Sequence, residues 1–311
     1  MPGAITSLPP HYQVNFANYF LENLAQQTDQ RLAGTYDEMV VTGEAYRGDI
    51  IGSQTYAMNG ITARAGKTEP SDVPFGFFWV RPRPFDKTTW IDQFDHILLG
   101  QLGDPTSPTL KEHLNAAWRQ YDLLELAALG GTRYIGSQGT TAQTLPTTGG
   151  PTGTGQTVAV TYGSGGTNSG LQLAKLIQAD RILNGNNVKR EGRFIVITSA
   201  ELYDLLANVD QVNSVLYNDS RALVDGMVKK FMGLEFKMTE LVPYASGSTT
   251  IHNCYAWQRD FLLHGMGEGV TNTIDRLPQQ SNAWQIYTAL LSDFTRKQDE
   301  GVVQIACDSS V

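Results

Sequence analysis

Residues 171–243 decide the fold, and they hold three stretches in order: LQLAKLIQADRILNG (171–185), RFIVITSAELYDLL (193–206) and GMVKKFMGLEFKMTELVP (226–243). The first stretch predicts a helix that ends at Asn184-Gly185. The second predicts a buried strand at 194–197, followed by a helix that begins with the capping box Thr198-x-x-Glu201. The third alternates apolar and polar side chains and predicts a strand. Helix, strand and helix in succession form one α/β unit, which does not by itself establish a parallel sheet.

A long helix is expected upstream, over residues 109–130. Ser107-Pro108 supplies a helix cap and a helix-starting proline, and the Gly-Gly pair at 130–131 ends the run. One apolar stripe along this helix includes Trp118 and Leu124, so we expect both side chains to be buried. Further leucines widen the stripe near the carboxyl end, and this end of the helix should therefore be covered on most sides.

Two segments before that helix bury little by themselves. Residues 1–38 predict an arm with one short amphipathic helix, whose apolar side includes Phe16 and Phe20. Residues 39–90 contain β-rich pieces separated by glycine turns, and they predict the two long strands of an extended hairpin. The tip of that hairpin, at 59–73, is polar and charged, so it cannot be core. Both segments need a partner to cover their aromatic side chains.

The remaining regular structure is expected to be strands. They are predicted at 255–257, 261–263, 285–291 and 302–306, and a Gly/Thr-rich loop or hairpin insertion is predicted over 135–170. Together with the helices, these strands predict an α+β fold.

Composition narrows the function. The chain has 311 residues, and its 23 basic and 31 acidic residues give a net charge of −8, which argues against a surface that wraps nucleic acid. Charged residues make up 17% of the chain, against about 25% in an average soluble protein, which suggests surface hidden in contacts. Two cysteines provide neither a disulfide framework nor a thiolate metal site. We also expect no secretory signal and no membrane-spanning segment.

No motif predicts catalysis. The Gly-rich run at 163–170 opens into a helix, as phosphate-binding loops do, but it lacks the lysine of one such motif and the third glycine of the other. The five histidines include no HExxH, and no GxSxG is present. We therefore expect a protein that is not an enzyme, with no catalytic residue, no cofactor and no metal.

The order of the elements carries the strongest signal. An arm, a long hairpin and a long capped helix precede the stretches of 171–243, in which G-x-V-x-x-F-x-G-x-x-F leads to Leu-x-Pro, and GVVQIACD (301–308) closes the chain. This order resembles the major capsid proteins of tailed phages, which share the HK97-like fold. The resemblance spans most of the chain.

The resemblance implies a division of the chain into four parts. These are an N-terminal arm (1–38), an extended E-loop hairpin (39–90), a peripheral domain with a spine helix (91–167, returning at 273–311) and an axial domain with a mixed sheet and helices (168–272). It also implies a protein that assembles in the host cytoplasm into hexamers and pentamers of an icosahedral virion shell around double-stranded DNA. A separate scaffolding protein, a portal and possible decoration proteins are the implied partners, and no membrane is involved.

Six residues are the predicted assembly contacts, namely Phe16, Phe20, Arg64, Lys67, Phe77 and Trp79. The aromatic run around Phe77 could instead stack nucleic acid bases. However, consecutive rings point to both faces of a strand, which favours burial between subunits. Some relatives form covalent Lys–Asn crosslinks, but no motif here matches Lys67 or an asparagine to them, so we predict no such bond.

Two alternatives remain open at this point. One is an encapsulin-like shell of the same fold, which would hold a protein cargo. The other is a phosphate-binding or nucleotide-binding enzyme that uses the loop at 163–170 and forms no large assembly.

Overall fold

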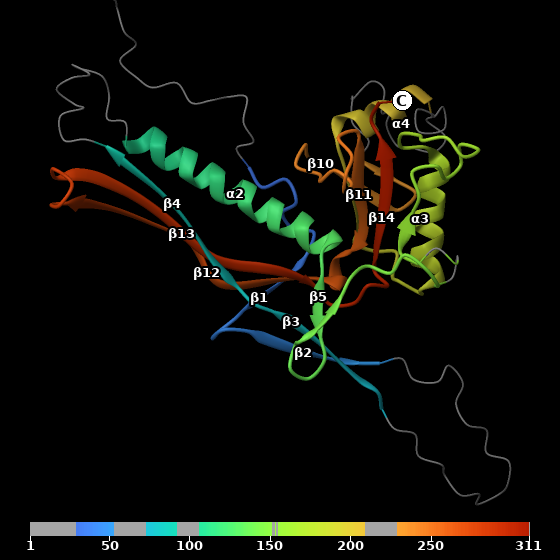
Figure 1. Ribbon diagram of the computed structural model, residues 1–311, viewed down its shortest axis with the longest axis horizontal. Helices are drawn as coiled ribbons and strands as arrows, with labels where there is room; N and C mark the ends of the chain where they lie inside the picture. Colours follow the sequence, from blue (N-terminus) through green and yellow to red (C-terminus); the bar gives the residue numbers. More distant parts are fainter. Residues whose placement is uncertain are drawn as a thin grey trace, which may run out of the picture.

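The computed structural model describes residues 29–52, 73–91, 106–150, 153, 155–208 and 229–310. Its described part contains three β-sheets and three helices longer than a single turn. Figure 1 shows a long sheet with a long helix on one side of the molecule, a second sheet with shorter helices on the other side, and a small third sheet extending away from their junction.

The long sheet has the strand order β1-β12-β13-β4. Its strands are β1 (Asp37–Val40), β12 (Leu262–Leu277), β13 (Ala283–Arg296) and β4 (Arg83–Ile91). β12 and β13 pair antiparallel along their length, and β1 joins β12 in parallel over four residues. Helix α2 (Thr106–Gly130) packs against this sheet, mainly on β13. α2 and the hairpin formed by β12 and β13 together make an elongated body (Figure 1).

The second sheet is mixed and has six strands in the order β7-β14-β11-β8-β10-β9. The strands are β7 (Thr157–Val158), β14 (Val302–Asp308), β11 (Ile251–Gln258), β8 (Arg193–Ile197), β10 (Leu234–Met238) and β9 (Lys230–Phe231). Helix α3 (Leu173–Gly185) packs on β14 and β7, and α4 (Ser199–Asn208) packs on β8. All five residues of β8 are buried, which explains its uninterrupted apolar centre: both faces of this strand are covered.

The third sheet is built on a hairpin and has the order β2-β3-β5-β6. β2 (Tyr46–Ile51) and β3 (Phe75–Val80) pair antiparallel. β3 also pairs antiparallel with β5 (Arg133–Ile135), and β5 pairs antiparallel with β6 (Thr141–Gln143). A single 3₁₀ turn, η1 (Arg259–Phe261), connects β11 to β12 and so joins the six-stranded sheet to the long sheet.

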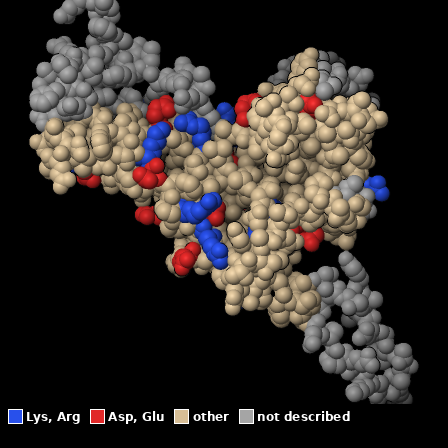
Figure 2. All heavy atoms as spheres, in the orientation of Figure 1, with Lys and Arg blue, Asp and Glu red and all other residues tan. Residues whose placement is uncertain are grey.

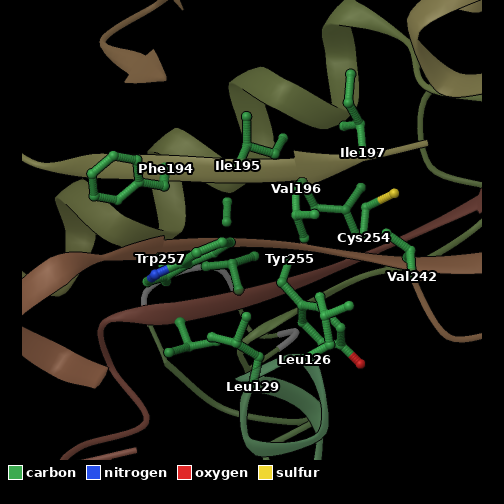
Figure 3. Close-up of a cluster of buried hydrophobic side chains, with 14 of the residues drawn as sticks. Leu126, Leu129, Phe194, Ile195, Val196, Ile197, Val242, Cys254, Tyr255 and Trp257 are labelled. Carbon is green, nitrogen blue, oxygen red and sulfur yellow. The ribbon is translucent and has the colours of Figure 1, made fainter. Parts of the chain in front are cut away.

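The main core lies where the carboxyl half of α2 meets the six-stranded sheet. Leu126 and Leu129 of α2 are almost completely buried and belong to the same apolar cluster as the β8 side chains and Trp257. Figure 3 shows both leucines projecting from α2 toward the strands. The helix therefore packs on the long sheet along its side and on the second sheet near its end.

Several sequence-based predictions are confirmed. The long helix begins three residues earlier than expected and ends at Gly130, and the helices and strand expected between 171 and 207 are present as α3, β8 and α4. Leu124 is buried as expected, at 6% exposure. The expectation for Trp118 is wrong in degree, because its side chain is only partly buried against the edge of the core.

Several strands lie in other sheets than the sequence-based division implied. The first half of β12, within the predicted axial part (168–272), pairs with β13 in the long sheet, and β7, within the predicted peripheral part (91–167), pairs with β14 in the six-stranded sheet. The hairpin predicted over 39–90 ends at Val80, because β4 pairs with β13 in the long sheet. The return to the peripheral domain predicted over 273–311 ends with β13, because β14 pairs with β11 and β7 in the six-stranded sheet. Strand partners depend on contacts between distant segments, which the local sequence pattern does not specify.

The packing of α2 yields a stability prediction with a matched control on the same helix. Leu129→Ala should lower the free energy of unfolding by about 2–5 kcal/mol, because Leu129 is fully buried and the core would retain a cavity. Leu123→Ala should change it by about 0.5 kcal/mol or less, since Leu123 is 43% exposed. Denaturant unfolding of the full-length subunit, followed by circular dichroism, measures both. Equal effects would show that α2 does not enter the core at Leu129.

Candidate assembly surface

One face of the β2–β3 hairpin is the candidate assembly surface. Residues opposite one another on antiparallel strands project to the same side, and the register pairs Arg47 with Trp79, Asp49 with Phe77 and Ile51 with Phe75. We call these six side chains the hairpin face. It contains two of the predicted contacts, Phe77 and Trp79.

The opposite side of the hairpin is buried within the subunit. Phe78 and Val80 form a small apolar cluster with Val41 and Leu263, and β3 is thereby anchored to the long sheet. Gly48 makes this packing possible, because a Cβ at that position would lie 2.0 Å from the Phe78 ring. The hairpin is thus packed against the subunit on one side, and the hairpin face lies on its other side.

Trp79 forms the inner end of the hairpin face and is engaged within the subunit. Its Nε1 donates a hydrogen bond to the Gly136 carbonyl at 2.7 Å, and the Arg81 guanidinium lies 5.9 Å from its ring centroid. Gly139, at φ +65°, approaches the ring so closely that a Cβ there would lie 2.8 Å from it. Trp79 therefore joins β3 to the β5–β6 turn, and only part of its surface remains accessible.

Phe77 occupies the middle of the hairpin face. The Arg47 guanidinium lies 5.0 Å from the ring centroid, a cation–π geometry, and Arg47 also forms an exposed ion pair with Asp49 at 3.2 Å. The ring is partly buried. The middle of the face thus combines an aromatic ring with one charge of each sign.

The outer end of the hairpin face is apolar and uncovered. Ile51 and Phe75 lie directly opposite each other in the register and are 67% and 64% exposed. In the part of the chain that the structure describes, neither belongs to a core cluster. The outer end of the hairpin face therefore carries two large apolar side chains, directly opposed and mostly exposed.

The structure brings together only part of the predicted contact set. Phe77 and Trp79 lie on the hairpin face, whereas Phe16, Phe20, Arg64 and Lys67 lie outside the described residues. Ile51 and Phe75 are the candidates that sequence reasoning missed. The alternation in FGFFWV (75–80) could have identified Phe75, because it places Phe75 on the same side as Phe77 and Trp79.

A buried ion cluster fixes the hairpin sheet to the rest of the subunit. Arg296, which is 1% exposed, donates from Nε to Asp299 at 3.0 Å and from Nη1 to the carbonyls of Ala128 and Leu129 near the end of α2. Arg133 of β5 donates from Nε to the same Asp299 carboxylate at 3.2 Å. Arg296 thus supplies the positive charge that α2 lacks in its own last turn.

A hollow of about 390 Å³ lies where the hairpin sheet meets α2 and β13. Its lining includes Arg81, Arg83 and Asp293, and the Arg83 Nη2 lies 3.4 Å from the Asp293 Oδ1. Burial raises the pKa of Asp293, and Arg83 opposes that shift. The hollow therefore carries both signs of charge and has no purely cationic lining for an anion.

The Gly-rich run at 163–170 has a structural explanation. The Leu171 backbone N–H donates to Asp204 Oδ2 at 3.1 Å, and a Cβ on Gly170 would lie 1.8 Å from the same oxygen. Burial is the main cause that raises the pKa of Asp204. A carboxyl group of α4 thus binds the backbone directly after this run, and Gly170 allows its close approach.

Neither a large patch of one charge on the face in Figure 2 nor a metal-ligand cluster stands out among the described residues. Figure 2 shows Lys and Arg side chains intermixed with Asp and Glu over the middle of this side of the molecule, with no field of a single sign. Within the described ranges, no group of three or more His, Cys, Asp or Glu residues could hold a metal ion. No helix there is long and apolar enough to span a bilayer.

Comparisons with known proteins agree with this geometry. Residues 8–309 match the family described as phage capsid protein. The fold is similar to the capsid of the cyanophage P-SCSP1u, with a TM-score of 0.71, 14% identity and coverage of 95% of this chain and 92% of that chain. It is also similar to the capsid of the cyanophage Pam1 and to the head of the Helicobacter pylori bacteriophage KHP40, each at 0.69, 10% identity and 99% coverage of both chains. No curated protein matches the sequence.

The buried ion cluster predicts a large mutational effect. Asp299→Asn should destabilise the subunit by about 3–5 kcal/mol, because it leaves the buried Arg296 without its counter-charge. Asp49→Asn makes the same change in the exposed Arg47 pair and should cost about 1 kcal/mol or less. Thermal unfolding of the two variants tests this ranking, and a similar loss of stability in both would contradict it.

Proposed function

The chain belongs to the phage capsid protein family and is a major capsid protein that forms an icosahedral head, and we propose that its hairpin face is a contact through which copies join. One observation carries the proposal. The face ends in Ile51 and Phe75, two opposed apolar side chains that are mostly exposed although the hairpin beneath them is anchored. Covering this surface with a neighbouring copy removes apolar area from water, which drives association.

The composition of the face suits contact with another protein. The apolar outer end lies next to the Phe77 ring and the Arg47–Asp49 ion pair. Large apolar side chains surrounded by polar ones are typical of protein interfaces. In a closed symmetric shell the same face recurs on every copy, so a modest gain per contact is multiplied. The pair of opposite charges at Arg47 and Asp49 adds orientation more than affinity.

The four-part division of the chain stays a proposal, with its boundaries moved to follow the strand pairings. The hairpin part ends at Val80 and the peripheral return ends with β13, because β4 and β14 pair elsewhere. The arm at 1–38 and the hairpin tip would add contacts through Phe16, Phe20, Arg64 and Lys67. Hexamers and pentamers are the proposed capsomers.

Partners beyond the chain itself also belong to the proposal. Double-stranded DNA would lie inside the shell, and a net charge of −8 suits an inner surface that does not grip phosphates. A separate scaffolding protein, a portal and decoration proteins are proposed from the same resemblance, as is assembly in the host cytoplasm. The family membership points to a structural rather than an enzymatic role.

A substitution at the outer end of the hairpin face tests the proposal. Phe75→Ser should leave the subunit folded, because the side chain is 64% exposed, but should reduce the yield of closed shells by about tenfold or more. Sedimentation velocity and electron microscopy measure assembly, and circular dichroism measures folding.

Phe75→Leu is the matched control, since it keeps an apolar side chain at the same place and should retain most of the assembly. Normal shell yield from Phe75→Ser, with an unchanged melting profile, would show that this end of the hairpin is not an assembly contact.

A further inference from the structure

The segment at 31–36, which connects the N-terminal residues to β1, is held against α2 by two buried carboxyl groups. Asp122 accepts hydrogen bonds from the backbone N–H groups of Arg31 at 3.0 Å and Leu32 at 3.3 Å. One helical turn further on, Glu125 contacts the Thr35 hydroxyl. Both carboxyl groups are fully buried.

The Thr35 hydroxyl lies between two oxygen atoms, and its hydrogen bonding depends on the protonation state of Glu125. The Thr35 Oγ1 lies 2.7 Å from the Leu32 carbonyl oxygen and 2.5 Å from the Glu125 Oε1. A hydroxyl has one proton, and it can donate that proton to only one of these two oxygens. Thr35 can donate to an ionised Glu125, because the Leu32 carbonyl also accepts from the Thr35 backbone N–H at 3.3 Å. If the Thr35 hydroxyl instead donates to Leu32, its contact with Glu125 is a hydrogen bond only when Glu125 carries a proton and donates it to Thr35.

The surroundings of Glu125 favour the protonated form. Across the described residues, Glu125 Oε2 is buried and has no hydrogen-bond partner, which is costly for a carboxylate. Three ionisable groups face it: Asp122 on the same helix, Tyr36 in the bound segment and Lys237 on β10. Asp122 disfavours a second negative charge, whereas the Thr35 hydroxyl and Lys237 favour it, so burial and Asp122 act against these two groups.

We propose that Glu125 is a proton-dependent latch. Protonated Glu125 holds residues 31–36 on α2, and ionisation of Glu125 releases them. The latch contact is the Glu125–Thr35 hydrogen bond beside the Asp122 contacts. Trp257 also binds this segment, because its Nε1 donates a hydrogen bond to the Thr35 carbonyl at 3.0 Å. The latch therefore joins the bound segment to both α2 and the six-stranded sheet.

The direction of the pH dependence follows from burial. Burial is the main cause that raises the pKa of Glu125 well above its usual value. A raised carboxyl pKa means that the closed latch binds a proton which the open latch releases at neutral pH. Closure is therefore most favourable at low pH, weakens as pH rises above the pKa of an exposed glutamate, and stops changing above the raised pKa.

The test compares hydrogen exchange in the full-length protein and in Glu125→Gln. Glutamine remains neutral and can donate to Thr35, so it mimics the protonated acid. In the unaltered protein, the protection factors of the Arg31 and Leu32 amides should fall by at least about tenfold between about pH 5 and about pH 9, a factor of ten per unit of pKa shift. In Glu125→Gln, they should stay constant.

Glu191→Gln is the control, because it removes one carboxylate at an exposed position and should keep the pH dependence of the unaltered protein. A ¹³C NMR titration of the glutamate carboxyl groups of the unaltered protein gives an independent result if the variant does not fold. One carboxyl should titrate well above the others. A constant protection factor in the unaltered protein, an unchanged pH dependence in Glu125→Gln, or titration of every glutamate in the ordinary range would overturn the latch.

Discussion

The burial of the carboxyl half of α2 is the constraint on which the rest of the structure depends. This half-helix meets the long sheet at its side and the six-stranded sheet at Leu126 and Leu129. Its last carbonyls are bound by Arg296, and Asp299 ties that arginine to Arg133 of the hairpin sheet. All three sheets are thus oriented around one helix end. The buried charge of Arg296 is compensated there by Asp299 and by two helix carbonyls, while its Nη2 has no hydrogen-bond partner among the described residues.

This arrangement explains how a subunit can be stable while part of its apolar surface stays open. The core around α2 holds the fold, and the small cluster at Phe78 anchors the hairpin, so the outer end of the hairpin face is not needed to stabilise the isolated chain. Its exposed end remains available for a neighbour. A shell protein needs its core and its contact surface to be separate, because the subunit must fold before it assembles and its contact surface must stay free for another copy.

The local elements were predictable from sequence, and their partners were less so. Capping residues, glycine stops and apolar periodicity located α2, α3, β8 and α4 within a few residues. Neither the hairpin expected over 39–90 nor the implied return over 273–311 anticipated the partners of β4 and β14, since register and sheet membership depend on distant segments. At the candidate site, Phe77 and Trp79 were recognised as aromatic residues in a strand. The exposure of Ile51 and Phe75 depends on where β2 and β3 emerge from the body, which no local pattern encodes.

The central claim is that the hairpin face is open in the subunit and covered by another copy in the shell. Electron cryomicroscopy of the assembled head, at a resolution that shows side chains, tests this claim most directly. The account predicts that Ile51 and Phe75 of each copy lie in van der Waals contact with a neighbouring copy, within about 4.5 Å. Shells in which both side chains face solvent in every copy would contradict it.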